Sequence, residues 1–160
     1  MSDFRVEKRR AEAELTLSTG TRVKGSFFLA GFSAGHSGPE RVSDVLNGKL
    51  QFFPFEVAST AGSQTVLLVN RAHVATVALP PNATEHQIEP GYDLAVERRV
   101  SVLLADGARV AGTVSIYLPT GHDRLSDYAQ FAQPFQYLET PDRTLIINSA
   151  YIVELLEAVE

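Results

Sequence analysis

Two copies of a short polar string carry the side chains best suited to recognise a ligand. Arg41 and Arg124 each stand two positions before a Ser-Asp pair. A guanidinium group presents a planar fork of N–H donors that matches a carboxylate or a phosphate. The string also fits the start of a helical turn, in which Ser or Asp accepts free main-chain N–H groups and the Arg pairs with an Asp or a carbonyl. The structural interpretation is favoured, and ligand binding stays open for Arg41, Ser43, Asp44, Arg124, Ser126 and Asp127.

Other residue patterns that would support catalysis or metal binding are missing from the sequence. The 160 residues include no Cys, which excludes disulfides, thiolate metal sites and a cysteine nucleophile. The chain has no nucleophile elbow, phosphate-binding loop, dinucleotide fingerprint or helical zinc-protease motif. Four histidines are present without the close spacing of a zinc site: His36, His73, His86 and His122. We therefore predict a protein with no catalytic residues, no metal and no cofactor.

The charge balance bears on the kind of partner. The formal net charge of −5 argues against a broad surface for binding phosphates. The N-terminal residues are too charged for a signal peptide, and no run approaches the roughly 18 apolar residues that cross a membrane. We expect a soluble, cytoplasmic protein with no membrane partner.

The chain also resembles itself along its length. Residues 15–25 recur 87 positions later as 102–112, and residues 66–77 recur 78 positions later as 144–155. Self-similarity at so long a period indicates that one folding unit occurs twice. The predicted organisation is a first domain at 1–79, a linker at 80–95 and a second domain at 96–160.

Each copy has the residue pattern of short strands. Apolar and polar residues alternate from Glu12 to Ser18, which places one face of a strand against a core. A hairpin turn follows, and the returning strand ends near Gly25 or Gly112, where a glycine marks a bend or the close approach of two main chains. Five such strands in each copy suit a small closed barrel without free edges.

The aromatic residues of the third strand divide between two faces. Phe53 and Phe55 align with Phe135 and Tyr137 at an offset of 82, and all four are predicted to be core. Phe52 falls on the opposite face. There, burial in a seam between the two copies is favoured over an exposed patch for a partner.

The order of these elements resembles the Sm-like variant of the SH3-type barrel. Residues 145–155 are similar to the second Sm signature, and the turn of that signature reads Asn-Arg-Ala at 70–72 and Asn-Ser-Ala at 148–150. Residues 41–47 and 124–128 are similar to a string found in an uncharacterised group of bacterial small-barrel domains. The resemblance implies an all-β fold of two tandem five-stranded Sm-like barrels that form a pseudo-symmetric pair.

Two classes of function fit this fold. The first is a non-enzymatic protein-interaction or scaffold module, which offers rim loops or free strand edges to another protein or to itself. The second, which the resemblance brings in, is single-stranded RNA binding, with bases stacked on loop aromatics and contacted by Asn47, Asn70 and Arg71. The acidic charge and the lack of a basic stripe favour the scaffold function.

Overall fold

The computed structural model describes most of the chain in both of its halves. The described residues are 8–31, 39–58, 62–81, 83, 96–116, 124–131 and 133–158, of which 127 and 131 are described by their main chain only. No helix within these ranges is long and apolar enough to cross a membrane.

The two halves contain the same elements in the same order. The N-terminal half consists of β1 (Lys8–Leu17), β2 (Arg22–Ala30), α1 (Val42–Leu46), β3 (Phe52–Ala58), β4 (Gln64–Asn70), the 3₁₀ turn η1 (Arg71–His73) and β5 (Val74–Ala78). The C-terminal half consists of β6 (Val96–Leu104), β7 (Arg109–Ile116), α2 (Leu125–Phe131), β8 (Phe135–Glu139), β9 (Thr144–Asn148), the 3₁₀ turn η2 (Ser149–Tyr151) and β10 (Ile152–Glu157).

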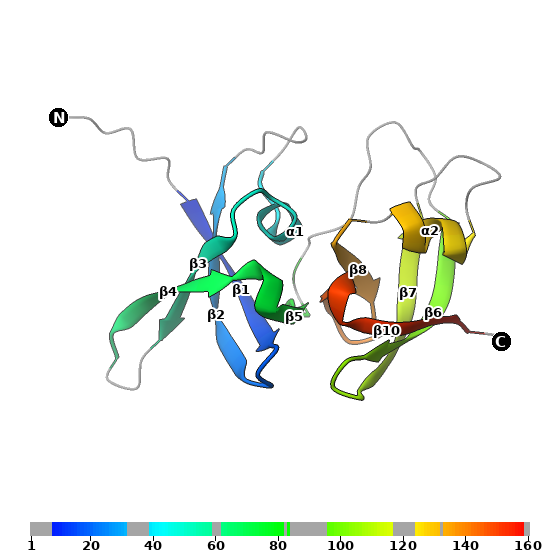
Figure 1. Ribbon diagram of the computed structural model, residues 1–160. Coiled ribbons are helices and arrows are strands. Elements are labelled where there is room, and N and C mark those ends of the chain that lie inside the picture. Colours follow the sequence, from blue (N-terminus) through cyan, green and yellow to red (C-terminus); the bar gives the residue numbers. More distant parts are fainter. Residues whose placement is uncertain are drawn as a thin grey trace.

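The strands form one open antiparallel sheet in the order β10-β6-β7-β8-β9-β5-β1-β2-β3-β4. The predicted all-β class is confirmed. The two halves lie side by side (Figure 1), and β5 of the first pairs with β9 of the second. Hydrogen bonding is therefore continuous across the halves instead of being divided into two five-stranded sheets. The pairing removes a row of unpaired N–H and C=O groups that each half would otherwise expose.

Strand register identifies corresponding positions in the two halves. Phe52 lies opposite Asn70 in the β3–β4 pair, and Phe135 lies opposite Asn148 in the β8–β9 pair. Phe135 thus corresponds to Phe52. The alignment of Phe135 with Phe53, predicted from sequence, is wrong by one residue, because β8 lies one position further along than the aromatic pattern alone indicates.

The core of the N-terminal half is built on aromatic contacts. Phe27 stacks on Phe53 and meets Phe55 edge to face, with ring centroids 5.2 Å apart in both pairs. All three rings are fully buried. Each buried ring of this size contributes several kcal/mol through removal of apolar surface from water, about 25 cal/mol per Å². The predicted core positions Phe53 and Phe55 are confirmed.

Three residues of the C-terminal half complete this same core. Phe135 and Tyr137 of β8 and Ile146 of β9 are buried within the cluster formed by strands β1–β5 and α1. The prediction that Phe135 and Tyr137 are core is confirmed, but the core they join belongs largely to the other half. A second cluster, which contains Val102, Ile116 and other residues, fills the C-terminal half.

A buried hydroxyl group without a described hydrogen-bond partner lies in that second cluster. Tyr128 of α2 is buried, and its hydroxyl has no hydrogen-bond partner among the described residues. Burial raises the pKa of this hydroxyl well above its ordinary value of 10. The folded state therefore holds the proton more tightly than the unfolded state does. The folded state favours the protonated hydroxyl, so this group does not lower the stability by ionising below pH 10. As the pH rises above 10, the unfolded state ionises first and the free energy of unfolding falls.

Replacing this tyrosine tests the point. Tyr128→Phe is expected to raise the free energy of unfolding at neutral pH by about 1 kcal/mol, because no desolvated hydroxyl remains. It should also lessen the loss of stability in urea unfolding between about pH 10 and 11. Tyr151→Phe is the control, since the Tyr151 hydroxyl donates to the carbonyl oxygen of Ala72 at 3.2 Å. A Tyr128→Phe protein less stable than wild type would contradict the expectation.

Candidate functional site

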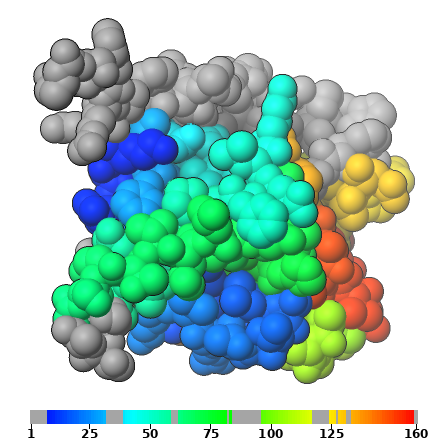
Figure 2. Space-filling model, turned by 60° about the vertical axis from the view of Figure 1, so that its left-hand side comes forward, coloured from blue at the N-terminus to red at the C-terminus, as the bar shows by residue number. Residues whose placement is uncertain are grey.

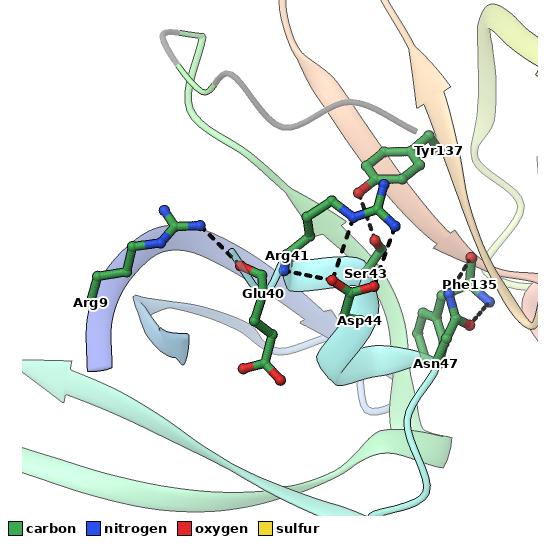
Figure 3. A network of polar contacts seen from close by, with 8 residues as sticks. All are labelled: Arg9, Glu40, Arg41, Ser43, Asp44, Asn47, Phe135 and Tyr137. Atoms are coloured by element: carbon green, nitrogen blue, oxygen red, sulfur yellow. Dashed lines mark hydrogen bonds and ion pairs between the residues drawn. The ribbon is translucent and has the colours of Figure 1, made fainter. Parts of the chain in front are cut away.

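The first copy of the polar string forms the beginning of α1. The Arg41 main-chain N–H donates to Asp44 Oδ2 at 2.7 Å, and the Arg41 guanidinium donates to the same carboxylate at 3.3 and 3.4 Å. Asp44 thus satisfies an N–H group at the helix start and pairs with the arginine. Figure 3 shows both contacts. They match the structural interpretation of the string.

Ser43 of α1 and Asn47, which caps the end of α1, bind the other half of the chain. Asn47 Nδ2 donates to the carbonyl oxygen of Phe135 at 3.0 Å, and the Phe135 N–H donates back to Asn47 Oδ1 at 2.8 Å. The Tyr137 hydroxyl donates to Ser43 Oγ at 2.6 Å, and Ser43 is itself buried. Asn47 and Ser43 therefore recognise β8, as Figure 3 shows from close by. We call the contact of α1 and β5 with β8 and β9 the seam.

The asparagine before each 3₁₀ turn has a related role. Asn70 Oδ1 accepts from the Ala72 N–H, and Asn148 Oδ1 accepts from the Ala150 N–H, both at 3.0 Å. Asn148 Nδ2 also donates across the seam to the carbonyl oxygen of Val74 at 2.9 Å. Among the described residues Asn70 Nδ2 makes no such bond, because β4 is the last strand of the sheet and pairs only with β3.

Arg71 ties its turn to the end of α1. Its main-chain N–H donates to the carbonyl oxygen of Gln51 at 2.8 Å, and its Nη1 donates to the carbonyl oxygen of Leu46 at 3.3 Å. The predicted residues of the N-terminal half, from Arg41 to Arg71, thus lie around one short helix. All of them except Asn70 bind the ends of that helix or contact β8, and Asn70 instead caps η1.

The second copy of the string lies at the start of α2, away from the first. Arg124 and Ser126 are exposed, and the Arg124 carbonyl oxygen accepts from the Tyr128 N–H at 3.0 Å. The side chain of Asp127 lies outside the described residues. The two strings therefore do not combine into one site: Ser43 of the first is buried in the seam, and Ser126 of the second faces solvent.

Exposed apolar side chains mark the two ends of the sheet, and they were not predicted from the sequence. The large apolar side chains exposed in the described chain all lie at β3–β4 or on β10: Leu50, Phe52, Val66, Leu67, Leu68, Val153 and Leu156. Phe52 is thus exposed and not in the seam, contrary to the favoured prediction. The signal in the sequence was β4 itself, a seven-residue strand with no charged residue and no proline.

The described residues offer little for other chemistry. No three His, Cys, Asp or Glu side chains within them lie close enough to hold a metal ion. Of the histidines, His73 lies in η1, where its Nδ1 is 2.9 Å from Ser18 Oγ. The other three, at 36, 86 and 122, lie outside the described residues.

Fold and site together define an all-β protein in which the residues of a polar string bind one half of the chain to the other. Comparison with protein-family models, with curated proteins and with solved structures finds no match.

Proposed function

We propose that this chain is a non-enzymatic, cytoplasmic protein-interaction or scaffold module. The observation that supports it is the seam, in which the string residues and an edge strand are already used to bind protein. Asn47 pairs with both main-chain groups of Phe135, and β5 adds to the edge of β9. Addition of a strand to a free edge is a general mode of protein recognition. The partner is another protein or a further copy of this chain.

The module consists of two duplicated small barrels of the Sm-like, SH3 type, arranged as a pseudo-symmetric pair. The identical order of elements in the two halves supports this architecture. So does the pairing of β1 with both β2 and β5, and of β6 with both β7 and β10. The last strand of each half carries a bulge near its start, at Ala75 of β5 and at Val153 of β10. A bulge bends a strand, as the closure of a small barrel requires.

RNA binding is less well supported by the same residues. The amide of Asn47 is engaged by Phe135, Asn70 Oδ1 accepts from the Ala72 N–H, and Arg71 binds the end of α1. The chain carries a net charge of −5, which weakens attraction to any polyanion. RNA binding is therefore kept as an outcome of the test.

The test compares three tagged proteins as baits in extracts of the native cell. We expect wild type to retain a stoichiometric protein partner and no nucleic acid. Leu68→Lys places a charge on the β4 edge and should lose the partner, whereas Thr21→Lys adds the same charge in the β1–β2 turn and should keep it. The proposal is contradicted if a fluorescent oligo-U binds the pure protein at micromolar strength with a steep salt dependence.

A further inference from the structure

We propose that copies of this chain assemble head to tail, with β4 of one copy pairing antiparallel with β10 of the next in the geometry of the internal seam. The inference rests on the proposed scaffold function and names its partner: a second copy of this chain. It follows from comparing the two free edges of the sheet with the two strands that already pair.

The free edges correspond, position by position, to the strands of the seam. β5 and β10 each pair with the first strand of their half, and each skips one residue at the same place in the ladder. Val77 opposite Leu15 thus corresponds to Leu155 opposite Val102. β4 corresponds to β9 in the same way, through the pairing of Asn70 with Phe52 and of Asn148 with Phe135. A β10 edge and a β4 edge are therefore left over at opposite ends of the sheet.

The seam fixes the register that such a pairing would have. In the seam, Val77 lies opposite Ile146 and Ala78 lies opposite Leu145. The corresponding positions place Leu155 of one copy opposite Leu68 of the next. They likewise place Leu156 opposite Leu67. The third seam pair, Thr76 with Ile147, corresponds to Glu154 opposite Val69. The two leucine pairs are apolar, and such pairs stabilise antiparallel strands.

Exposure differs sharply between corresponding residues. Ile146 is 0% exposed in the seam, whereas Leu68 at the corresponding position is 71% exposed. Phe135 is 4% exposed, and the corresponding Phe52 is 49% exposed. Figure 2 shows β4 (green) at the outer surface of the N-terminal half. The C-terminal half therefore buries these apolar side chains against the N-terminal half, whereas the corresponding side chains of the N-terminal half are exposed.

The two helices also differ in whether a strand of a neighbouring half contacts them. The carbonyl oxygens of Arg41 and Arg124 each accept a main-chain hydrogen bond from the residue four positions later, so the two arginines occupy matching places in α1 and α2. By the same offset, Ser43 corresponds to Ser126 and Asn47 corresponds to Gln130. The α1 pair is engaged by β8, whereas Ser126 and Gln130 are both exposed. In the assembly, α2 faces β3 of the next copy as α1 faces β8. Gln130 then takes the place of Asn47 beside the main chain of Phe52.

A contact of this kind is heterologous, because the two surfaces differ. Each copy keeps one β4 edge and one β10 edge, so addition continues until a ring closes or a filament grows. The contact is weaker than the seam, which gains from the covalent tether between the halves. It also lacks the hydroxyl of Tyr137, since the corresponding residue on β3 is Pro54. Assembly should therefore depend on concentration.

The mass of the pure protein in solution tests the assembly. At about 100 µM, a hundredfold above a micromolar Kd, wild type and Thr21→Lys should sediment well above the 17.4 kDa of one chain. Leu68→Lys should sediment as a single chain at the same concentration. A wild-type protein that stays at 17.4 kDa overturns the inference. If that monomer still captures another protein in the bait experiment, the scaffold function stands without self-assembly.

Introduced cysteines test the register, since the chain contains no Cys of its own. In the seam, the Leu79 N–H donates to the carbonyl oxygen of Thr144, so the adjacent pair Ala78–Leu145 is the closer, non-hydrogen-bonded type. Leu156→Cys mixed with Leu67→Cys should therefore form disulfide-linked dimers under mild oxidation. Leu156→Cys with Thr65→Cys, two positions out of register, should form at least tenfold fewer, because the Cα atoms lie too far apart.

The two single-cysteine proteins also distinguish the direction of assembly. Each alone should give no disulfide-linked dimer, because a heterologous contact never brings two β4 edges together. Efficient dimers from Leu67→Cys alone, together with a solution mass of two chains, would show a symmetric β4–β4 contact and overturn the inference. Variant folding is checked by urea unfolding. Every substituted position is exposed, so each variant is expected to shift stability by less than about 0.5 kcal/mol.

Discussion

Gly25→Ala is expected to destabilise the protein by about 3 kcal/mol or more, the largest effect of alanine at any glycine that the structure describes. A Cβ at position 25 would overlap the carbonyl oxygen of Glu56 and would lie 2.7 Å from the ring of Phe55. Neither group is able to retreat, because Glu56 pairs with Ser26 in the β2–β3 ladder and Phe55 is fully buried. Strands β2 and β3 would have to separate.

Thermal and urea unfolding measure this effect. Tm should fall by roughly 6–12 °C for a chain of this size. Gly112→Ala should also destabilise, since a Cβ there lies 2.6 Å from the carbonyl oxygen of Glu139. Gly31→Ala is the control, because a Cβ at Gly31 meets nothing within 4 Å. Equal stability of Gly25→Ala and Gly31→Ala would show that β2 and β3 do not approach as closely as described.

Asn47→Ala is expected to cost about 2 kcal/mol of stability, because it leaves both the N–H and the carbonyl oxygen of Phe135 unpaired in the seam. The corresponding Gln130→Ala should change stability by less than about 0.5 kcal/mol in dilute solution, since Gln130 is exposed there. The two substitutions remove an amide from matching positions of α1 and α2. The difference between them therefore isolates the seam.

Urea unfolding at low protein concentration gives the comparison, with Ser43→Ala and Ser126→Ala as a second matched pair. Ser43→Ala removes the acceptor of the Tyr137 hydroxyl and should destabilise, whereas Ser126 is exposed. If Asn47→Ala left stability unchanged but abolished capture of a protein partner, the role of Asn47 would be external binding instead of the seam.

Local features of the fold were predictable because they depend on neighbours in the sequence. Gly20 and Gly107 adopt φ of 86° and 89° in their hairpin turns, a conformation that glycine reaches without a Cβ clash. The alternation in β1 and the glycines at 25 and 112 likewise indicated strands and a close approach of two main chains. The offset of the third strand was misjudged by one residue, because Phe52, Phe53 and Phe55 offer the aromatic pattern more than one alignment.

The candidate site was predictable only in part. Pairing of Arg41 with Asp44, three positions apart, follows from local geometry and was weighed from the sequence. The partners of Ser43 and Asn47 lie 94 and 88 residues away, and no local pattern identifies them. The sequence likewise showed two similar strings but could not show that one is covered and the other is open.

By itself, the sequence determined the class of fold, the similarity of the two halves and the positions of turns and core aromatics. These depend on side-chain periodicity and on the conformational freedom of single glycines. Only the tertiary structure decided that β5 joins β9 and that β4 and β10 remain as edges. Each of the two similar halves has two strand edges, so the chain has four. The single contact between the halves pairs two of them, β5 and β9, and leaves β4 and β10 at the ends of the sheet. Which edges pair is settled by how the connected halves meet in space.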